Sequence, residues 1–366
     1  MTTLPDVTII GGGIIGLLTA RTLINEGATV RLIDKNQIAQ ESSWAGSGIL
    51  LPLYPWRQSE AVNQLVQASL PLYPILCNEL FADTNIDPEW TASGLLITKI
   101  ADINTATHWC GSHNIHAESP PASLYTPLNT TVSNPLWLPN VAQARNPRLV
   151  KSLKQDLLNK GVEIIENCKL NSIKLQNQQV QAINTSHGSY STKQLVIATG
   201  AWTSLVFEEL LPSYLTCRPH IAPAKGQIVV FQAPPETLPF IVLDGEQYLI
   251  PRRDGKILVG STVEYVGFDK TPQAETREQL NYFACQLLPA LKNYPIIHHW
   301  AGLRPGTEHG IPYIGVHPEI ENLYINAGHF RYGLVMAPAS TRLLVDLMLN
   351  RSPLIDPRPY QLNSVH

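Results

Sequence analysis

Residues 7–34 read VTIIGGGIIGLLTARTLINEGATVRLID, and this stretch decides the fold. The β-branched run at residues 7–10 predicts a buried strand, and residues 14–26 predict a helix. Residues 29–33 predict a second strand, which ends at Asp34. A strand, a helix and a strand within about 30 residues make one complete βαβ unit. The sequence therefore predicts a parallel α/β sheet at its N-terminal end.

The loop between the first strand and the helix has the spacing GxGxxG. Gly11 permits the tight turn, Gly13 lets the backbone approach a pyrophosphate, and Gly16 lets the helix pack against the strand. N–H groups at the start of the helix would bind the anion. Asp34 is placed to accept a hydrogen bond from a ribose hydroxyl, and its charge argues against a 2′-phosphate. This pattern predicts dinucleotide binding, but it does not distinguish FAD from NAD.

The composition excludes some classes of function. The chain has 366 residues, of which 44% are hydrophobic and 15% charged, so apolar material for a core is ample. This length predicts about two domains. A net charge of −3 leaves no electrostatic footprint for nucleic acid or an acidic membrane surface. We therefore expect no nucleic-acid partner.

The cysteines and the N-terminal segment bear on location. The five cysteines are scattered, odd in number and without CxxC spacing, which predicts reduced thiols in a cytoplasmic protein. The apolar residues 7–20 are interrupted by glycines and lack a preceding basic segment. Neither a secretory signal nor a membrane span is therefore expected.

Further along the chain, helical and strand patterns alternate. Helices are expected at residues 60–81 (kinked or broken by Pro71 and Pro74), 147–160, 276–291 and 338–350, and strands at 162–165, 172–175, 180–183 and 195–198. Residues 217–263 alternate apolar and polar side chains between turn signals, which predicts antiparallel sheet. Parallel pieces towards both ends, with an antiparallel block between them, predict two interleaved domains.

Several further motifs occur together. They are ESSWAGSG (41–48), ATGAW (198–202), YLIPRRDGKILVGST (248–262), WAGLRPGT (300–307), PYIG (312–315) and GHFRYGL (328–334). In combination with the glycine loop, this set resembles the glycine oxidase branch of the D-amino acid oxidase family. The resemblance covers most of the chain, while residues 100–146 are poorly anchored.

The resemblance implies a D-amino acid oxidase-like fold of α/β and antiparallel sheet. A Rossmann-like FAD-binding domain (residues 1–85, 145–215 and 300–366) would be interleaved with a mostly antiparallel β substrate-binding domain (86–144 and 216–299). The implied FAD contacts are Gly11, Gly13, Ile14, Ile15, Gly16, Asp34, Lys35, Ser42, Ser43, Gly46, Ser47, Gly48, Ile49, Leu170, Gly200, His329, Phe330, Tyr332, Gly333, Leu334 and Val335. The FAD is expected to be noncovalent, because Pro305-Gly306 stands where monomeric sarcosine oxidases carry a flavin-linking cysteine.

An amino acid substrate needs its carboxylate held while its α-carbon faces the flavin. Arginine suits this task because its planar fork binds carboxylate through two hydrogen bonds. By position, the resemblance implies that Arg304, Arg331 and Tyr248 hold the substrate carboxylate. For Arg252 and Arg253, which follow Tyr248, a structural or solvent-exposed role is expected.

The implied reaction is oxidative deamination of glycine or another small amino acid, such as sarcosine or a small D-amino acid. A hydride would pass from the α-carbon to flavin N5, so no residue is assigned as acid or base. The products would be an imine or 2-oxo acid and hydrogen peroxide, and molecular oxygen or another acceptor would reoxidise the flavin. The product would feed thiazole formation for thiamine, or catabolism. The resemblance leaves the oligomeric state open, a homo-oligomer included.

Some alternatives remain open at this point. Tyr332 and the bulky residues 51–56 could reshape the pocket, which leaves the preferred amino acid undecided. A D-amino acid dehydrogenase that reduces a quinone is the second enzyme class, and a flavoprotein scaffold without catalysis is a third reading. A zinc module would use His108, Cys110, His113 and His116, but no supporting Cys/His group accompanies them, so no metal is expected.

Overall fold

The computed structural model describes residues 5–364. Its first large sheet has six strands in the order β17-β18-β11-β1-β2-β7. The strands are β1 (Val7–Ile10), β2 (Val30–Ile33), β7 (Glu163–Ile165), β11 (Gln194–Ile197), β17 (Tyr313–His317) and β18 (Ile320–Ala327). All neighbours pair in parallel except β17, which joins β18 antiparallel at one edge. The central strand β1 is buried along its whole length, as expected of a parallel strand covered on both faces, and Thr8 is its only polar residue.

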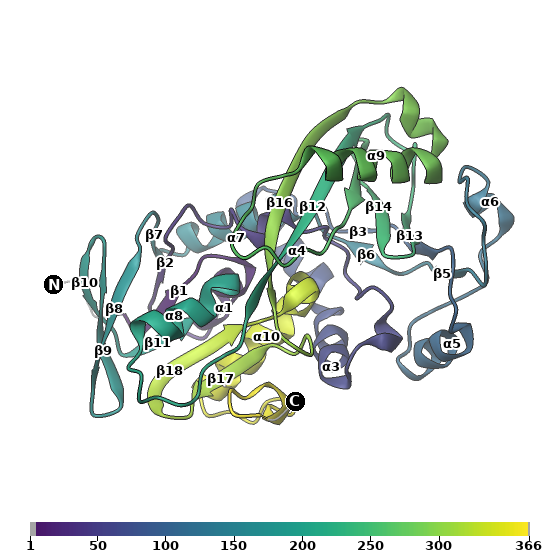
Figure 1. The fold of residues 1–366 in the computed structure, drawn as a ribbon. Helices are drawn as coiled ribbons and strands as arrows, with labels where there is room; N and C mark the ends of the chain where they lie inside the picture. Colours follow the sequence, from purple (N-terminus) through teal and green to yellow (C-terminus); the bar gives the residue numbers. More distant parts are fainter. Residues whose placement is uncertain (1–4, 365–366) are drawn as a thin grey trace.

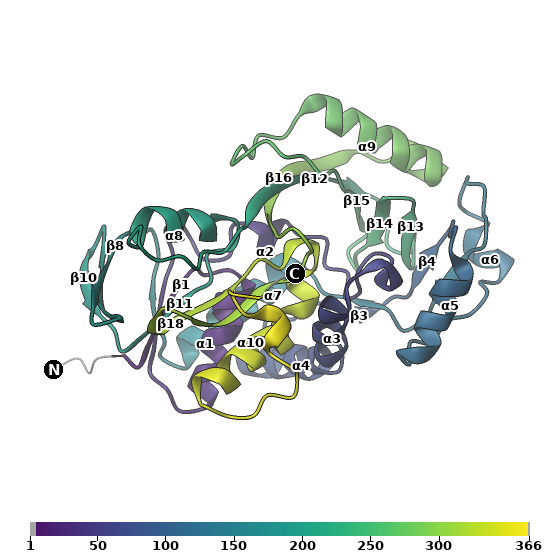
Figure 2. The ribbon, with the colours of Figure 1, turned by 60° about the horizontal axis from the view of Figure 1, so that its bottom comes forward.

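Helices cover one face of this sheet and a smaller sheet lies on the other. Figure 2 shows α1 (Ile14–Asn25), α3 (Glu60–Ser69), α4 (Leu72–Thr84), α7 (Asn146–Asn159) and α10 (Gly333–Met348) on one side and α8 (Thr203–Leu210) on the other. The small sheet consists of β8 (Leu170–Gln176), β9 (Gln179–Thr185) and β10 (Gly188–Ser191). Successive residues of β1 serve the two layers, because Ile9 packs among the helices and Ile10 packs with Phe207 of α8.

The second large sheet has seven strands in the order β16-β12-β15-β14-β13-β4-β5. They are β4 (Leu95–Ile97), β5 (Leu136–Leu138), β12 (Ala222–Gln232), β13 (Ile241–Asp244), β14 (Gln247–Pro251), β15 (Lys256–Gly260) and β16 (Ile296–Gly306). Only the β4–β13 pair is parallel. The long strands β12 and β16 extend from this sheet towards the first one (Figure 1).

The two faces of the second sheet have different partners. Helix α9 (Ala274–Leu287) covers the outer face, where Leu280 packs with Val229 and Leu249. The alternate residues, Tyr248 among them, point to the inner face. This alternation turns the Tyr248 side chain towards the first sheet.

The remaining elements are short. They are α2 (Ser42–Ala45), β3 (Thr91–Ala92), α5 (Ile103–Ser112), α6 (Ala122–Tyr125), β6 (Ala142–Gln143) and five 3-10 turns at Pro55–Arg57, Gly200–Trp202, Pro289–Asn293, Phe330–Tyr332 and Arg358–Tyr360. No helix within residues 5–364 is both long and apolar enough to cross a membrane.

We propose the two large sheets as the cores of the two expected domains. Strand β16 belongs to the second sheet and runs to Gly306. The boundary expected at residue 299 is therefore better placed at the end of β16.

Two expected helices have different bounds in the structure. The helix expected at residues 60–81 is divided at Pro71 into α3 and α4. The helix expected to begin at Pro338 begins at Gly333, so that expectation was wrong by more than one turn. Proline inside a helix leaves the carbonyl four residues earlier without its N–H partner. Here the hydroxyl of the buried Tyr73 donates to that carbonyl, on Leu334, and α10 continues through the proline.

Phenylalanine at position 73 is expected to lower the free energy of unfolding by about 1–3 kcal/mol, because the Leu334 carbonyl would lose its partner. Urea unfolding measures the change. Tyr282→Phe is the matched control, since that side chain is 69% exposed on α9. Equal destabilisation by the two substitutions would contradict the role given to Tyr73.

Candidate active site

A cavity of about 450 Å³ lies between the two sheets and gathers segments far apart in the chain. Every residue expected to contact FAD lines it except Gly16. Arg304, Arg331 and Tyr248 line it as well. The lining residues form two groups that differ in chemistry, one around the glycine loop and one around Arg304.

The glycine loop brings the start of α1 to the cavity wall. Gly11 has φ +108°, and a Cβ there would lie 2.3 Å from the Ala198 carbonyl oxygen. A Cβ on Gly16 would lie 1.9 Å from the Gly11 oxygen, so Gly16 acts through packing without reaching the cavity. Gly13 precedes the helix and supplies no side-chain cap. The first turn of α1 therefore presents N–H groups to the cavity.

Asp34 organises this loop directly. Its Oδ2 accepts a hydrogen bond of 2.7 Å from Gly12 N–H, and its Oδ1 accepts one of 2.8 Å from Asn36 N–H. Burial raises the pKa of the carboxyl group. Asp34 thus joins the end of β2 to the glycine turn while it lines the cavity.

Two of the serines expected to contact FAD differ in their bonding. Ser43 Oγ accepts a 2.8 Å hydrogen bond from Ile14 N–H, which leaves the hydroxyl proton able to point at an anion. Ser42 instead donates to the Leu303 carbonyl on β16. Ser42 therefore links α2 to the strand that carries Arg304.

The indole of Trp202 lines the cavity and is held by residues of a distant segment. Lys35 Nζ lies 3.5 Å from the centroid of the Trp202 ring, and Trp202 stacks on Phe268. Lys270 forms an ion pair of 2.8 Å with Glu41 nearby. The segment that contains Phe268 and Lys270 belongs to neither sheet, and no sequence motif pointed to it.

The loop before α10 holds a neutral histidine. His329 is 2% exposed, its Nε2 lies 2.7 Å from Ser340 Oγ, and burial lowers the pKa of the imidazole to about 3. Ser340 in turn donates to Asn326 Oδ1 at 2.8 Å, so the Nε2–H of His329 donates to Ser340. This buried series of hydrogen bonds, from His329 through Ser340 to Asn326, fixes the loop that continues into Arg331 and Tyr332.

Arg304 also lines the cavity and has no carboxylate partner within residues 5–364. Its guanidinium donates to the Thr262 carbonyl at 3.0 Å and to Ser261 Oγ at 2.7 Å. The side chain crosses over Gly226, where a Cβ would lie 2.3 Å from both terminal nitrogens. Burial lowers the pKa of Arg304 from its very high ordinary value. The result is an oriented cation with donor capacity left for an anion.

Three more side chains surround this cation. Tyr248 is 4% exposed, and its hydroxyl makes no hydrogen bond in the described part of the chain. Tyr332 is also buried, and burial raises its pKa to about 12. Arg331 lies 3.6 Å from the exposed carboxylate of Glu246. The part of the cavity around Arg304 is therefore cationic, and the phenol rings of Tyr248 and Tyr332 form its walls.

The arrangement fits FAD. The cavity volume is within the ~300–1,000 Å³ of cofactor pockets. A helix start whose N-cap residue is Gly13 suits a pyrophosphate, Asp34 lines the cavity with a carboxylate that could accept from a ribose hydroxyl, and Trp202 adds apolar surface to the wall. A family model described as FAD dependent oxidoreductase matches residues 6–347. The chain belongs to this family. The cofactor of this FAD-dependent oxidoreductase is FAD, and the expected fold class is confirmed.

Individual relatives agree with the family. The oxidoreductase is 41% identical to a glycine oxidase of Pseudomonas putida over 97% of both chains. It is 31% identical to the bifunctional protein ThiO/ThiG of Synechocystis over 97% of its own length, which spans 53% of that longer protein. The crystal structure of glycine oxidase from Geobacillus kaustophilus superposes with a TM-score of 0.92 at 25% identity, over the full length of both chains.

The residues of the zinc alternative have other partners. His113 stacks on Trp109 with ring centroids 4.3 Å apart, and its Nδ1 lies 2.9 Å from the Trp109 carbonyl oxygen. His116 lies 3.7 Å from Glu118. Within residues 5–364, no group of three or more histidine, cysteine or acidic side chains is arranged to hold a metal ion.

Proposed function

We propose that this FAD-dependent oxidoreductase catalyses the oxidative deamination of glycine. Glycine, oxygen and water give glyoxylate, ammonia and hydrogen peroxide. The observation that carries the proposal is Arg304, an oriented cation at the cavity wall that no carboxylate within residues 5–364 neutralises. Such a group binds a substrate carboxylate through charge-assisted hydrogen bonds. The relation to the glycine oxidase of P. putida supports the choice of substrate.

The surroundings of Arg304 support a small amino acid. Tyr248, Tyr332, Leu51 and Ile228 line the same cavity, and all four are less than a tenth exposed. Bulky side chains on these walls leave little volume for a substrate side chain. We propose that Tyr248 and Arg331 complete the carboxylate site, with the Tyr248 hydroxyl as a further donor.

The chain contributes orientation and exclusion of water to the chemistry. Bound FAD supplies the acceptor for the two electrons. Tyr332 stays protonated at neutral pH because burial raises its pKa to about 12, so it does not act as a base. The Nε2–H of His329 is engaged with Ser340. We therefore assign no general acid or base.

An amino acid panel tests this proposal. The FAD-loaded protein is mixed with glycine, sarcosine, N-ethylglycine, D-alanine or D-proline, and peroxide and dye reduction are followed in parallel. Peroxide from glycine in air is expected. Dye reduction without peroxide would indicate the dehydrogenase instead, and flavin that no amino acid reduces would indicate the scaffold without catalysis.

We further propose that the imine product supplies thiazole formation for thiamine. The support is the Synechocystis relative, in which a matching segment is joined to a second protein in one chain. A strain without this gene is expected to require added thiamine for growth. Growth at the normal rate without thiamine would favour a catabolic role.

The cytoplasm remains the proposed location. All five cysteines are free, and three of them are buried, as expected of a reducing compartment. Fractionation of cells tests the location, and sedimentation of the purified protein tests whether it forms a homo-oligomer.

A further inference from the structure

Arg252 is a buried cation outside the carboxylate site. It directly follows β14 and is 8% exposed. Its Nη2 donates to the Ser47 carbonyl at 2.7 Å, and its Nη1 donates to Gln143 Oε1 at 2.5 Å and to the Ala144 carbonyl at 3.3 Å. All of these acceptors are neutral. Arg252 forms no ion pair with any residue of the 5–364 segment.

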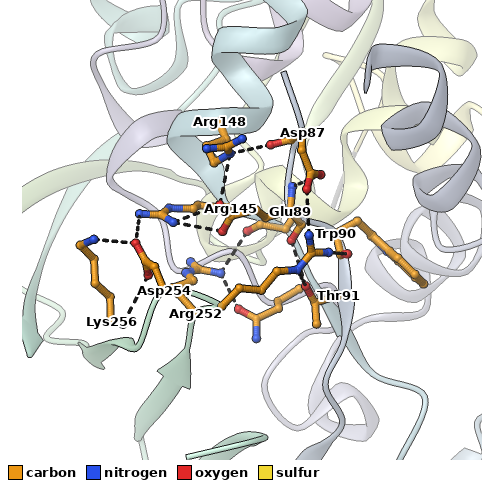
Figure 3. Close-up of polar contacts among 12 residues, drawn as sticks. Asp87, Glu89, Trp90, Thr91, Arg145, Arg148, Arg252, Asp254 and Lys256 are labelled. Atoms are coloured by element: carbon orange, nitrogen blue, oxygen red, sulfur yellow. Dashed lines mark hydrogen bonds and ion pairs between the residues drawn. The ribbon is translucent and has the colours of Figure 1, made fainter. Parts of the chain in front are cut away.

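The acidic side chains beside Arg252 form ion pairs with a neighbouring arginine instead. Arg145 lies 3.0 Å from Glu89 and 3.0 Å from Asp254, and Figure 3 shows it between the two carboxylates. Burial lowers the pKa of Arg252 to about 10, which still leaves it charged at neutral pH. Burying a cation against neutral carbonyls is unfavourable for stability in itself. The burial of Arg252 is therefore better explained by the segments that its guanidinium binds than by a gain in stability from the burial itself.

Arg252 holds one wall of the flavin cavity. Ser47 and Gly48 line the cavity, and Gly48 has φ +87° with its Cβ position only 2.1 Å from the Ala144 oxygen. Ala144 N–H donates to the Gly48 carbonyl at 2.9 Å. The guanidinium thus joins the Ser47–Gly48 segment of the cavity wall, and the Gln143–Ala144 segment beside it, to the end of β14. Tyr248 lies four residues earlier on that strand.

We propose that Arg252 is a positioning residue that fixes the Ser47–Gly48 wall against β14 and thereby preorganises the FAD site. Without the fork, the Ser47 carbonyl loses its donor and the loop can leave the conformation that FAD requires. Tyr248 would then also lose its fixed distance from the flavin. The proposal concerns FAD binding, so it does not depend on which amino acid is the substrate.

Arg253 provides a matched control beside Arg252. It carries the same charge, but its Nη1 pairs with Asp87 at 2.8 Å and its Nη2 donates to the Trp90 carbonyl at 2.6 Å. Its side chain is half exposed, and its hydrogen-bond partners Asp87, Trp90 and Thr91 do not line the cavity. Figure 3 shows Asp87, Trp90 and Thr91 together on the side away from Arg145.

The test compares Arg252→Met with Arg253→Met. FAD is removed from each protein, and the Kd for FAD is measured by quenching of flavin fluorescence. Arg252→Met is expected to raise the Kd about 10–100-fold, as charge-assisted hydrogen bonds are lost, and Arg253→Met less than about 3-fold. The visible spectrum of bound FAD should change only in Arg252→Met. For Arg252→Ala, millimolar guanidinium should restore FAD affinity, whereas sodium chloride at the same ionic strength should not.

A purely structural role gives a different result. If Arg252→Met lowers the unfolding temperature of the FAD-free protein but its Kd for FAD matches that of Arg253→Met, the proposal is overturned. If Arg252→Met does not fold, Arg252→Lys decides, because one ammonium group cannot span both backbone segments. We expect Arg252→Lys to fold with a Kd for FAD at least about 3-fold above wild type. Wild-type affinity in Arg252→Lys would overturn the proposal, whatever the outcome of the glycine assay.

Discussion

Replacement of Arg304 by alanine is expected to lower kcat/KM for glycine about 10²–10³-fold. The variant loses the charge-assisted hydrogen bonds to the substrate carboxylate, a loss of about 3–4 kcal/mol of transition-state binding. Most of the effect should appear in KM, since the carboxylate is held in both the ground state and the transition state. FAD should remain bound, because Arg304 donates hydrogen bonds to Thr262 and Ser261 and none to the glycine loop or Asp34. Steady-state kinetics with glycine, together with the flavin absorbance, measure both quantities.

Arg277→Ala is the control for this variant. Arg277 lies on α9, which covers the outer face of the second sheet, and its partner is Glu278 at 2.9 Å. The Arg277→Ala substitution removes the same charge from a residue that does not line the cavity, so kcat/KM should stay within about 2-fold of wild type. If Arg304→Ala behaved like Arg277→Ala, the assignment of the carboxylate site would be wrong.

Local signals predicted that the glycine loop and Asp34 belong to one βαβ unit, and the structure places both at the cavity. The glycine spacing, the β-branched strands and Asp34 lie within one βαβ unit, where neighbours in sequence are also neighbours in space. The expected strand at residues 7–10 and the break at Pro71 are confirmed. The same locality explains the error at Pro338. The helix continues through Pro338 because the Tyr73 hydroxyl donates to the Leu334 carbonyl. Tyr73 lies more than 260 residues away in the sequence, so no local pattern could reveal this bond.

Long-range contacts account for the rest of the candidate site. Nothing around Phe268 predicts that it stacks on Trp202, and nothing around Arg252 predicts that its acceptors are Ser47 and Ala144. The sequence allowed Arg252 either a structural or a solvent-exposed role, and the structure excludes solvent exposure. Arg252 acts through backbone groups of distant segments and Phe268 through a ring that is distant in sequence, so neither residue leaves a local motif.

Gly226 illustrates the same point and gives a second strong prediction. It lies on β12, and the Arg304 side chain occupies the space where a Cβ would stand, 2.3 Å from two guanidinium nitrogens. Alanine at position 226 must therefore displace the guanidinium. The end of an arginine side chain moves more easily than backbone, so the fold and FAD binding should persist. A shift of about 1 Å in a substrate-positioning group can cost about 10²-fold in rate, and we expect kcat/KM for glycine to fall by a similar factor.

Two comparisons decide whether Gly226→Ala acts through Arg304. Gly111→Ala, at a site on α5 with no neighbouring atom within 4 Å of the added Cβ, should leave the kinetics unchanged. The double variant Gly226→Ala/Arg304→Ala should be no slower than Arg304→Ala alone, because a displaced guanidinium cannot be lost twice. Additive losses in the double variant would mean that Gly226 supports the site by another route. Non-additive losses would show that Gly226 on β12 acts through Arg304 on β16. The arginine would then keep its position because residue 226 has no Cβ.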